Sequence, residues 1–239
     1  NITAVVTVAD DGGSSGILRS DLGMLAPGDV RNCVSALAEV DPVMGELLNF
    51  RFKDGSLKGH SLGNLFLAAL NETSSSFDEA VKKFSHLAGV VGTVYPVTNE
   101  SVTLSALLED GRLIEGESHI GVHHDGPKNG IVKLMVNPEK PKAVDGVIKA
   151  LEKADIIVLG PGSLYTSIIP NLLVDGVVDA IKKSNAVKIY VCNIMSQAGE
   201  TENYTVSDHL AAIERHSYEG IADIVIANNA IIPESLRIK

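Results

Sequence analysis

The first loop of this 239-residue chain carries residue types that can hold a phosphorylated ligand. It joins two carboxylates to glycines and hydroxyls, in the run Asp10, Asp11, Gly12, Gly13, Ser14 and Ser15. Glycines let backbone N–H groups approach a ligand closely, and such groups can surround an anion. Asp10 and Asp11, with Asp29, can also hold Mg²⁺ beside a diphosphate, because magnesium takes one or two protein carboxylates plus phosphate oxygens. The alternative is a solvated acidic turn in which Asp10 caps a helix.

Two later loops follow apolar stretches and add further candidates. The second forms a tight turn whose hydroxyls and N–H groups can hold phosphate, and its candidate residues are Gly160, Pro161, Gly162, Ser163, Tyr165 and Thr166. It has no Walker A lysine, so it is not an ATPase P-loop. The third loop, 193–204, contains Asn193, Gln197 and Glu200, which suit recognition of a base or a sugar. The alternative for that loop is a polar surface segment.

Arg19, Arg31 and His60 are the cationic or titratable side chains near these loops. Arg31 falls in the first turn of a predicted helix, where a cation opposes the macrodipole, so an anionic partner would explain it. His60 precedes another helix and can act as a general base, although a lone histidine is more often structural. We therefore take Asp11 and His60 as the candidate catalytic residues. Further ligand candidates beside them are Gly28, Asp29, Asn32 and Asn64.

A histidine-containing loop, 119–130, raises the separate question of a metal site. His123, His124 and Asp125 can in principle bind a metal ion. Adjacent histidines in a loop rarely converge on one ion, so we do not favour this interpretation.

Strands and helices that alternate along the chain must position these loops. An apolar run over 2–9 predicts a buried strand, and helices are predicted from Pro27, with Asp29 as N-cap, after Ser61, and over 77–87. Residues 93–136 predict a small antiparallel β insertion with a hairpin at Asp110 and Gly111. Beyond residue 141 the predicted segments are a helix through 144–151, a strand over 155–159, a loop over 160–170, a helix over 172–182, a strand over 187–192, a helix from 208 and a strand over 224–227.

This alternation predicts an α/β fold in a single domain, a Rossmann-like parallel sheet with helices on both faces. Ligands of such sheets bind beyond the carboxyl ends of the strands, where the candidate loops lie. The chain begins with Asn1 and enters directly into a buried strand, so we expect an upstream segment.

Composition limits the classes of partner. The formal charge of -10 and the pI near 5.1 disfavour binding to nucleic acid. No apolar run reaches the 18 to 20 residues or so that a spanning helix needs, so no membrane span is expected. Cys33 and Cys192 lie far apart, with neither a metal-site nor a disulfide spacing, which favours a cytoplasmic location.

Five motifs occur in order along nearly the whole chain. They are Val-Thr-Val-Ala-Asp-Asp-Gly-Gly-Ser-Ser-Gly (6–16), Pro-Gly-Asp-Val-Arg-Asn-Cys (27–33), Gly-His-Ser-Leu-Gly-Asn-Leu (59–65), Gly-Pro-Gly-Ser-Leu-Tyr-Thr-Ser-Ile-Ile-Pro-Asn-Leu-Leu (160–173) and Asn-Ile-Met-Ser-Gln-Ala-Gly-Glu-Thr (193–201). Together they resemble the bacterial gluconeogenesis-factor family, within the 2-phospho-L-lactate transferase-like superfamily. That family has an earlier first strand and a glycine-rich turn that this sequence does not contain.

The resemblance implies binding of a nucleotide sugar of the UDP-N-acetylglucosamine type, or another dinucleotide-like small molecule. It also implies a role in cell shape and envelope synthesis during growth on gluconeogenic carbon sources, with a protein partner there. The carboxylates of the first loop, not the resemblance, make Mg²⁺ with a bound nucleotide the one cofactor considered. A homo-oligomer is compatible with the sequence.

Two alternatives remain open at this stage. The first is a Mg²⁺-dependent transferase that uses a nucleotide-activated donor. The resemblance implies that the distant transferases of the superfamily join a lactyl-phosphate group to a deazaflavin precursor. Aromatic residues make up only 4% of this chain, too few for an evident deazaflavin pocket. The second is an NAD(P)-dependent oxidoreductase, against which the absence of a Gly-x-Gly-x-x-Gly turn in this sequence argues.

Overall fold

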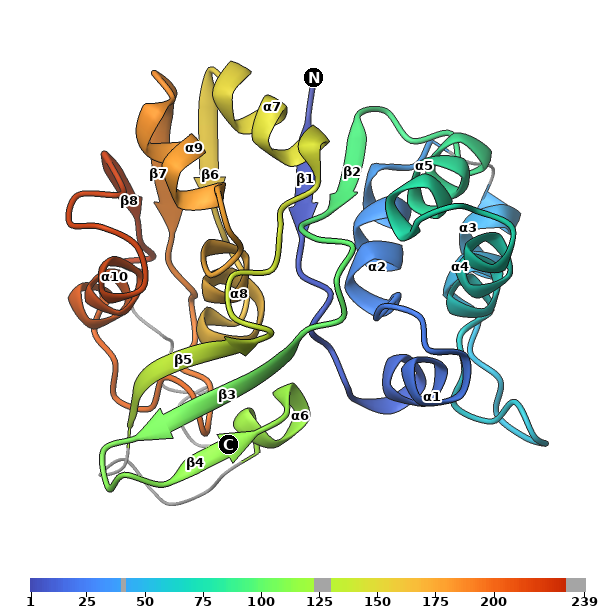
Figure 1. Cartoon of the computed structure of the whole chain (residues 1–239), viewed down its shortest axis with the longest axis horizontal. Helices are drawn as coiled ribbons and strands as arrows, with labels where there is room; N and C mark the ends of the chain where they lie inside the picture. Colours follow the sequence, from blue (N-terminus) through green and yellow to red (C-terminus); the bar gives the residue numbers. More distant parts are fainter. Residues whose placement is uncertain (40–41, 123–129, 231–239) are drawn as a thin grey trace.

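The computed structural model describes residues 1–39, 42–122 and 130–230, and its fold is mixed α/β, as predicted (Figure 1). Two groups of parallel strands stand upright in Figure 1, with a small antiparallel sheet below them. The strands are β1 (Thr3–Val6), β2 (Thr93–Pro96), β3 (Thr103–Leu108), β4 (Leu113–Glu115), β5 (Ile131–Asn137), β6 (Ile156–Leu159), β7 (Val187–Val191) and β8 (Ile224–Ile226).

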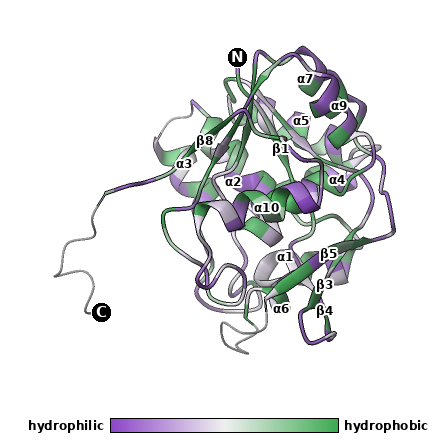
Figure 2. Ribbon diagram, turned by 90° about the vertical axis from the view of Figure 1, so that its left-hand side faces the viewer, coloured by the Kyte–Doolittle hydropathy of each residue, from purple (hydrophilic) through white to green (hydrophobic). Residues whose placement is uncertain are grey.

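The helices lie around these sheets and connect their strands. They are α1 (Gly13–Leu22), α2 (Gly28–Leu37), α3 (Pro42–Asn49), α4 (Leu62–Glu72), α5 (Phe77–Leu87), α6 (Glu117–Ile120), α7 (Asp145–Lys153), the π-helical segment η1 (Leu164–Ile168), α8 (Ile169–Leu172), α9 (Val177–Lys183) and α10 (Val206–Arg215). In Figure 2, helices such as α7 and α9 carry both hydrophilic and hydrophobic stretches, as expected of helices with one face on the core.

The parallel strands form two sheets in this structure rather than one. One sheet pairs β1 with β2 and the other has the order β6-β7-β8. The predicted start of the antiparallel insertion at residue 93 is also wrong, because β2 pairs in parallel with β1. The antiparallel sheet has the order β4-β3-β5 and covers 103–137, and the hairpin predicted at Asp110 and Gly111 joins β3 to β4.

Several local predictions need correction. The first loop is shorter than expected, because α1 already begins at Gly13. Pro27 is the N-cap of α2, so Asp29 lies within its first turn and does not cap it. The loop predicted over 160–170 contains η1 and the start of α8.

The spacing of Leu62, Leu65, Phe66, Ala69 and Leu70 predicts one apolar face for α4, and the buried face of the structure differs from it. Leu67 and Ala68 are buried, whereas Phe66 is exposed. Gly63 and Asn64 complete the buried face, because the helix packs closely against Arg31 and the carbonyl group of Leu48. The apolar spacing alone did not show this close approach.

Candidate functional site

A polar crevice of about 360 Å³ lies where the loops after β1 and β6 meet the antiparallel sheet. Its position beyond the carboxyl ends of parallel strands is the one that α/β sheets use for ligands, and its volume is in the range of small-molecule sites. Residues from all three predicted loops reach it. The described lining consists of Asp10, Asp29, Glu117, Ser118, Gly121, Val122, Ser163, Thr166, Ser167, Gln197 and Glu200.

Asp10 and Asp29 supply two carboxylates to this crevice. The Oδ1 atom of Asp10 accepts the N–H of Gly12 at 2.9 Å, whereas Oδ2 accepts no hydrogen bond from the described residues. A Cβ atom on Gly28 would lie 2.9 Å from that Oδ2 and 2.6 Å from Oγ of Ser15, so a larger residue there would displace these two side chains. Burial raises the pKa of Asp29 and the charge of Asp10 raises it further, although Arg31 opposes both effects.

Glu117 brings a third carboxylate from the start of α6, which follows β4 of the antiparallel sheet. Burial raises its pKa to about 7, and repulsion from Asp10, Asp11, Asp29 and Glu200 contributes. Glu117 was not among the residues predicted from sequence, although a Gly-Glu-Ser run directly after a short β segment was a usable signal. Gly116, which precedes it, has a φ of 94° and starts the turn into α6.

Asp11 is not among the described residues that line the crevice, and its carboxylate holds α6 in place. Its two carboxylate oxygens accept the N–H groups of Glu117 at 3.0 Å and Ser118 at 2.8 Å. Burial would raise the pKa of Asp11, but these hydrogen bonds and the charge of Arg19 outweigh burial and lower it. The geometry therefore gives Asp11 a structural role, joining the first loop to the insertion, and does not support it as a catalytic residue or a metal ligand.

Arg19 and Arg31 also have structural roles. Arg19 donates from Nη1 to the carbonyl groups of Ala9 and Asp10, both at 3.0 Å, and from Nη2 to that of Val102 at 2.8 Å. Arg31 is buried and donates from Nη1 to Oδ1 of Asn49 at 2.7 Å. Neither arginine lines the crevice, so the described lining contains carboxylates and no cationic side chain.

His60 lies in a buried hydrogen-bond network rather than at the crevice. Its Nδ1 atom is 3.0 Å from Oγ of Ser14, which also accepts a hydrogen bond from Nδ2 of Asn64 at 3.1 Å. All three side chains are buried, and the network joins the amino-terminal ends of α1 and α4. This geometry argues against His60 as a general base acting on a ligand in the crevice.

The second and third loops are bonded to each other. The side-chain amide of Asn193 donates to the carbonyl group of Gly162 at 2.7 Å and accepts its N–H at 3.2 Å. Glu200 accepts hydrogen bonds from the N–H of Tyr165, from Oγ1 of Thr166 and from Nε2 of Gln197. These bonds orient Ser163, Thr166 and Gln197 along the crevice, so Asn193 is a positioning residue.

The remaining candidate residues either stabilise the fold or line a second cavity. Tyr165 is buried, and its hydroxyl donates to the carbonyl group of Ile131 at 3.1 Å. Asn32, Gly160, Pro161 and Gly162 line a larger groove between β1 and β6. The candidate metal residues His123, His124 and Asp125 lie outside the described residues, within which no group of three or more His, Cys, Asp or Glu is placed to hold a metal ion.

Comparison with known proteins assigns the chain to a family. The model of the family described as 2-phospho-L-lactate transferase CofD matches residues 1–239, so the chain belongs to this family. Within it, the chain groups with the gluconeogenesis factors, because it is 45% identical over 242 aligned residues to the gluconeogenesis factor of Bacillus subtilis, of which it covers 74%. A crystal structure of a Bacillus halodurans protein superposes with a TM-score of 0.95 at 46% identity, over 99% of this chain and 75% of the other.

Some relatives are considerably longer than this chain. A Clostridium acetobutylicum relative is 50% identical over all 239 residues, and the chain spans about half of it, 53%. Within the described residues, no helix is both long and apolar enough to cross a membrane. Both cysteines carry free thiols.

Proposed function

We propose that the chain binds a nucleotide sugar of the UDP-N-acetylglucosamine type, as its Mg²⁺ complex, in the crevice between Asp10, Glu117 and Thr166. The observation that carries this proposal is the composition of the lining: hydroxyl, amide and carboxylate groups converge beyond two parallel strands, and both nearby arginines are engaged elsewhere. An anionic diphosphate placed among carboxylates requires a cation between them.

The residues present fit such a cation. Asp10 keeps Oδ2 free of described hydrogen-bond donors, and Asp29 lies close enough to Asp10 for the charge of Asp10 to raise its pKa. Two carboxylates plus phosphate oxygens and water are a usual magnesium environment. When bound, Mg²⁺ would neutralise the diphosphate, with Asp10 and Asp29 as its protein ligands in place of the predicted pair Asp10 and Asp11.

The hydroxyl and amide groups that line the crevice would orient the sugar or the base. Ser163, Thr166 and Gln197 lie there, and Glu200 and Asn193 hold them in position. In this proposal the protein is a regulatory binder that supports cell shape and envelope synthesis during gluconeogenic growth. The bound state would be recognised by a protein partner through the antiparallel sheet, because α6, which supplies Glu117 to the crevice, connects two of its strands.

The family model carries the name of a transferase, so transfer from a nucleotide-activated donor is the second candidate function. Two observations favour the binder. No aromatic side chain occurs in the described lining, although a flat deazaflavin acceptor would need stacking partners. The side chains of Asp11 and His60, the residues proposed from sequence for catalysis, are both held in hydrogen bonds within the fold.

Isothermal titration calorimetry on the full-length protein distinguishes the nucleotide-sugar binder from the transferase. The ligands are UDP-N-acetylglucosamine, GDP and NAD, each with and without Mg²⁺. We expect the UDP-sugar to bind best and only with Mg²⁺, and Asp29→Asn to weaken it at least about tenfold, which corresponds to about 1.4 kcal/mol. Asp21→Asn, a change at an exposed position on α1, is the matched control and should leave binding unchanged.

Two outcomes would contradict the proposal. Equal binding with and without Mg²⁺ would remove the role of Asp10 and Asp29. Preference for GDP, accompanied by product formation from nucleotide-activated lactate, would establish the transferase instead.

A further inference from the structure

Two side chains hold the outer edge of β5, the last strand of the antiparallel sheet. The sheet has the order β4-β3-β5, so within the described residues β5 has a strand partner on one side only. At its other edge the N–H of Leu134 donates to Nε2 of His216 at 2.8 Å, and the carbonyl group of Ile131 accepts the hydroxyl of Tyr165 at 3.1 Å. These bonds satisfy peptide groups that an open strand edge would leave unpaired.

His216 connects this edge to α10. It is the residue at which α10 ends, and its Nδ1 atom lies 2.7 Å from the carbonyl oxygen of Ala212. A carbonyl oxygen can only accept, so Nδ1 carries the proton and Nε2 presents its lone pair to the N–H of Leu134. The two bonds together require the neutral imidazole with its proton on Nδ1.

A second proton on this ring would break one of the two bonds. Both ring nitrogens of a charged imidazole are donors, so an N–H on Nε2 would face the N–H of Leu134. The bond from Nδ1 to Ala212 would become stronger, because its donor would then be charged, and this bond keeps the ring on α10. The strand β5 is therefore the partner that loses its contact.

The surroundings of His216 favour the neutral ring. Burial lowers the pKa of His216, and the charges of Arg215 on α10 and Lys133 on β5 lower it further, against the hydrogen bond to Ala212. The ring of Tyr165, in η1, meets the imidazole edge to face, with the two centroids 6.1 Å apart. Burial raises the pKa of Tyr165, so its hydroxyl stays uncharged and keeps its bond to β5.

The antiparallel sheet connects this contact to the polar crevice. β5 pairs with β3 and β3 with β4, and α6, which supplies Glu117 to the crevice, begins two residues after β4. On the opposite side, the N–H of Tyr165 donates to the carboxylate of Glu200, which also lines the crevice. The position of the sheet against α10 and η1 therefore influences how Glu117 lies relative to Glu200.

We propose that His216 is a pH-sensitive latch, which holds the antiparallel sheet against α10 when it is neutral and releases β5 when it is protonated. Release loosens the wall of the crevice to which α6 belongs, so ligand affinity falls. This consequence for affinity rests on the proposed function, whereas the latch itself is a property of the ligand-free protein.

Nuclear magnetic resonance on the ligand-free full-length protein tests the latch. The nitrogen chemical shifts of the His216 ring show which nitrogen carries the proton, and we expect Nδ1 at pH 7.5. As His216 takes up its second proton, amide exchange of Leu134 should become at least about tenfold faster relative to Val97, whose N–H donates to the carbonyl group of Val6. A proton on Nε2 at pH 7.5, or unchanged exchange of Leu134 while His216 titrates, would overturn the proposal.

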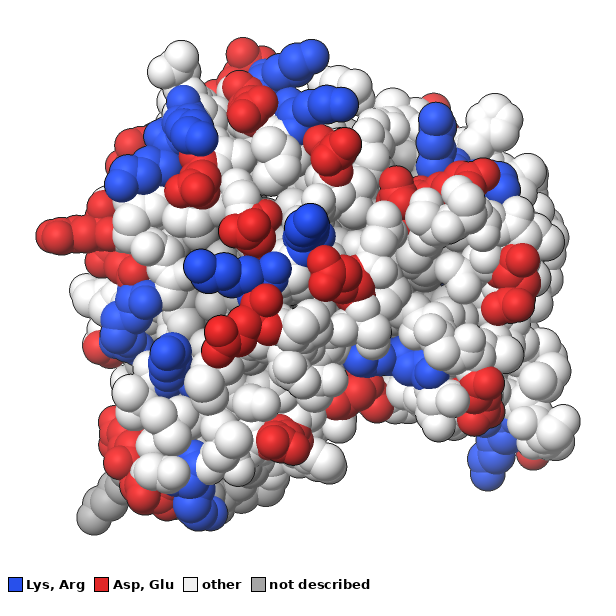
Figure 3. Space-filling view, viewed as in Figure 1, with Lys and Arg blue, Asp and Glu red and all other residues white. Residues whose placement is uncertain are grey.

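Variants separate His216 from the other groups that titrate in acid. Asp and Glu side chains are spread over the face of the molecule shown in Figure 3, so wild type and variants are compared at pH 5 and at pH 7.5. His216→Gln offers an amide oxygen to Leu134 and does not titrate, so we expect exchange close to the wild-type value at pH 7.5 and no rise in acid. His216→Phe removes the acceptor and should speed exchange of Leu134 at least about tenfold at both pH values.

His86→Gln, a change at an exposed position on α5, is the matched control. It should keep the wild-type pH dependence of Leu134 exchange. A rise in acid of the same size in His216→Gln as in the wild type would overturn the proposal, because it would assign the release of β5 to another titrating group.

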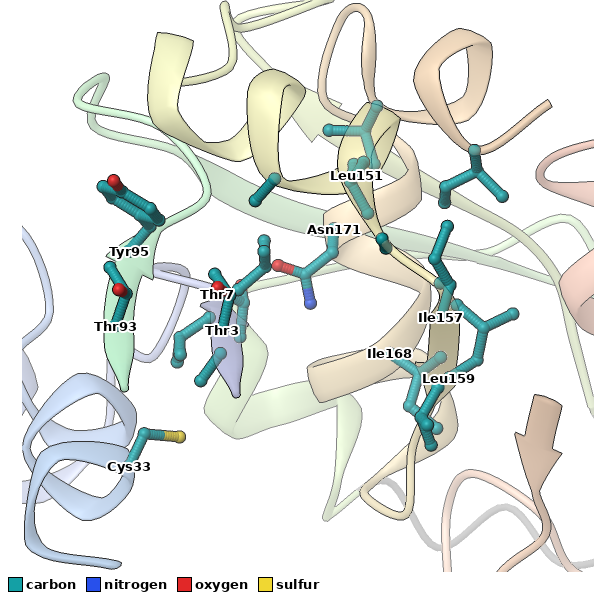
Figure 4. Close-up of a pocket in the computed structure, with 18 of the residues that line it drawn as sticks. Thr3, Thr7, Cys33, Thr93, Tyr95, Leu151, Ile157, Leu159, Ile168 and Asn171 are labelled. Atoms are coloured by element: carbon teal, nitrogen blue, oxygen red, sulfur yellow. The ribbon is translucent and has the colours of Figure 1, made fainter. Parts of the chain in front are cut away.

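Calorimetry with UDP-N-acetylglucosamine and Mg²⁺ distinguishes the latch from the proposed function. Neither Leu134 nor His216 lines the described part of the crevice or the groove between β1 and β6 shown in Figure 4, so the variants leave the lining side chains unaltered. We expect His216→Phe to bind about threefold or more weakly than the wild type at pH 7.5, and His216→Gln to bind equally. Equal binding by His216→Phe would overturn the connection to the crevice. Absence of binding in every protein would contradict the proposed function, while the exchange of Leu134 still decides the latch.

Discussion

Glu117 offers the sharpest test of the electrostatics of the crevice. Burial and the neighbouring carboxylates raise its pKa from the usual 4.5 to about 7. At 1.36 kcal/mol per pKa unit this difference corresponds to about 3.4 kcal/mol at most. Glu117 is only half-buried, and solvent screening reduces the figure to about 1 to 2 kcal/mol.

The sign follows from proton linkage. Between pH 4.5 and pH 7 the folded protein holds a proton on Glu117 that the unfolded chain has released, so this residue makes stability fall as pH rises through that window. Glu117→Gln removes the charge and keeps the shape of the side chain. We expect the variant to be more stable than the wild type by about 1 to 2 kcal/mol at pH 8 and nearly equal to it at pH 4.5.

Urea denaturation of both proteins at the two pH values measures this difference. Glu115→Gln, a change at an exposed position in β4, is the control and should keep the wild-type pH dependence. Mg²⁺ at pH 8 should reduce the advantage of Glu117→Gln, because a bound cation stabilises the ionised carboxylate. An identical pH dependence in Glu117→Gln and the wild type would refute the argument that the crevice concentrates negative charge.

Three further changes probe the packing around the site. Gly63→Ala places a Cβ atom 2.5 Å from the carbonyl oxygen of Leu48, so we expect a loss of about 2 kcal/mol or more in thermal denaturation, and wild-type stability would contradict that close approach. Asp11→Ala leaves two N–H groups of α6 without their acceptor, so we expect it to destabilise the protein by about 1 to 3 kcal/mol. It should also speed amide exchange in α6 relative to α5, and unchanged exchange in α6 would refute the anchoring role of Asp11. Tyr165→Phe removes the hydroxyl that reaches the carbonyl group of Ile131, and we expect a loss of about 1 kcal/mol in urea denaturation, with no change if the hydrogen bond contributes nothing.

Much of the fold followed from local patterns. The turn after the first apolar run, the helix that begins beside Gly28 and the turn at Gly160 were all predicted, because glycine, proline and apolar periodicity act over a few residues. The antiparallel hairpin at Asp110 and Gly111 followed for the same reason. The start of the antiparallel insertion could not be predicted in this way, because β2 pairs with β1 through residues about 90 positions apart.

The loops that meet at the crevice were determined by the sequence itself, through the order of strands and turns. Which side chains enter the crevice was decided only by tertiary structure. Asp11 and Arg19 have types suited to ligand binding, yet Asp11 accepts backbone N–H groups of α6 in the antiparallel segment, and Arg19 donates to backbone carbonyl groups of the first loop and of Val102. Glu117 comes from that segment and meets Asp10 across more than 100 residues. Spacing along the chain cannot predict this, because the direction of a side chain and its partner depend on contacts that exist only after the sheets and helices have packed.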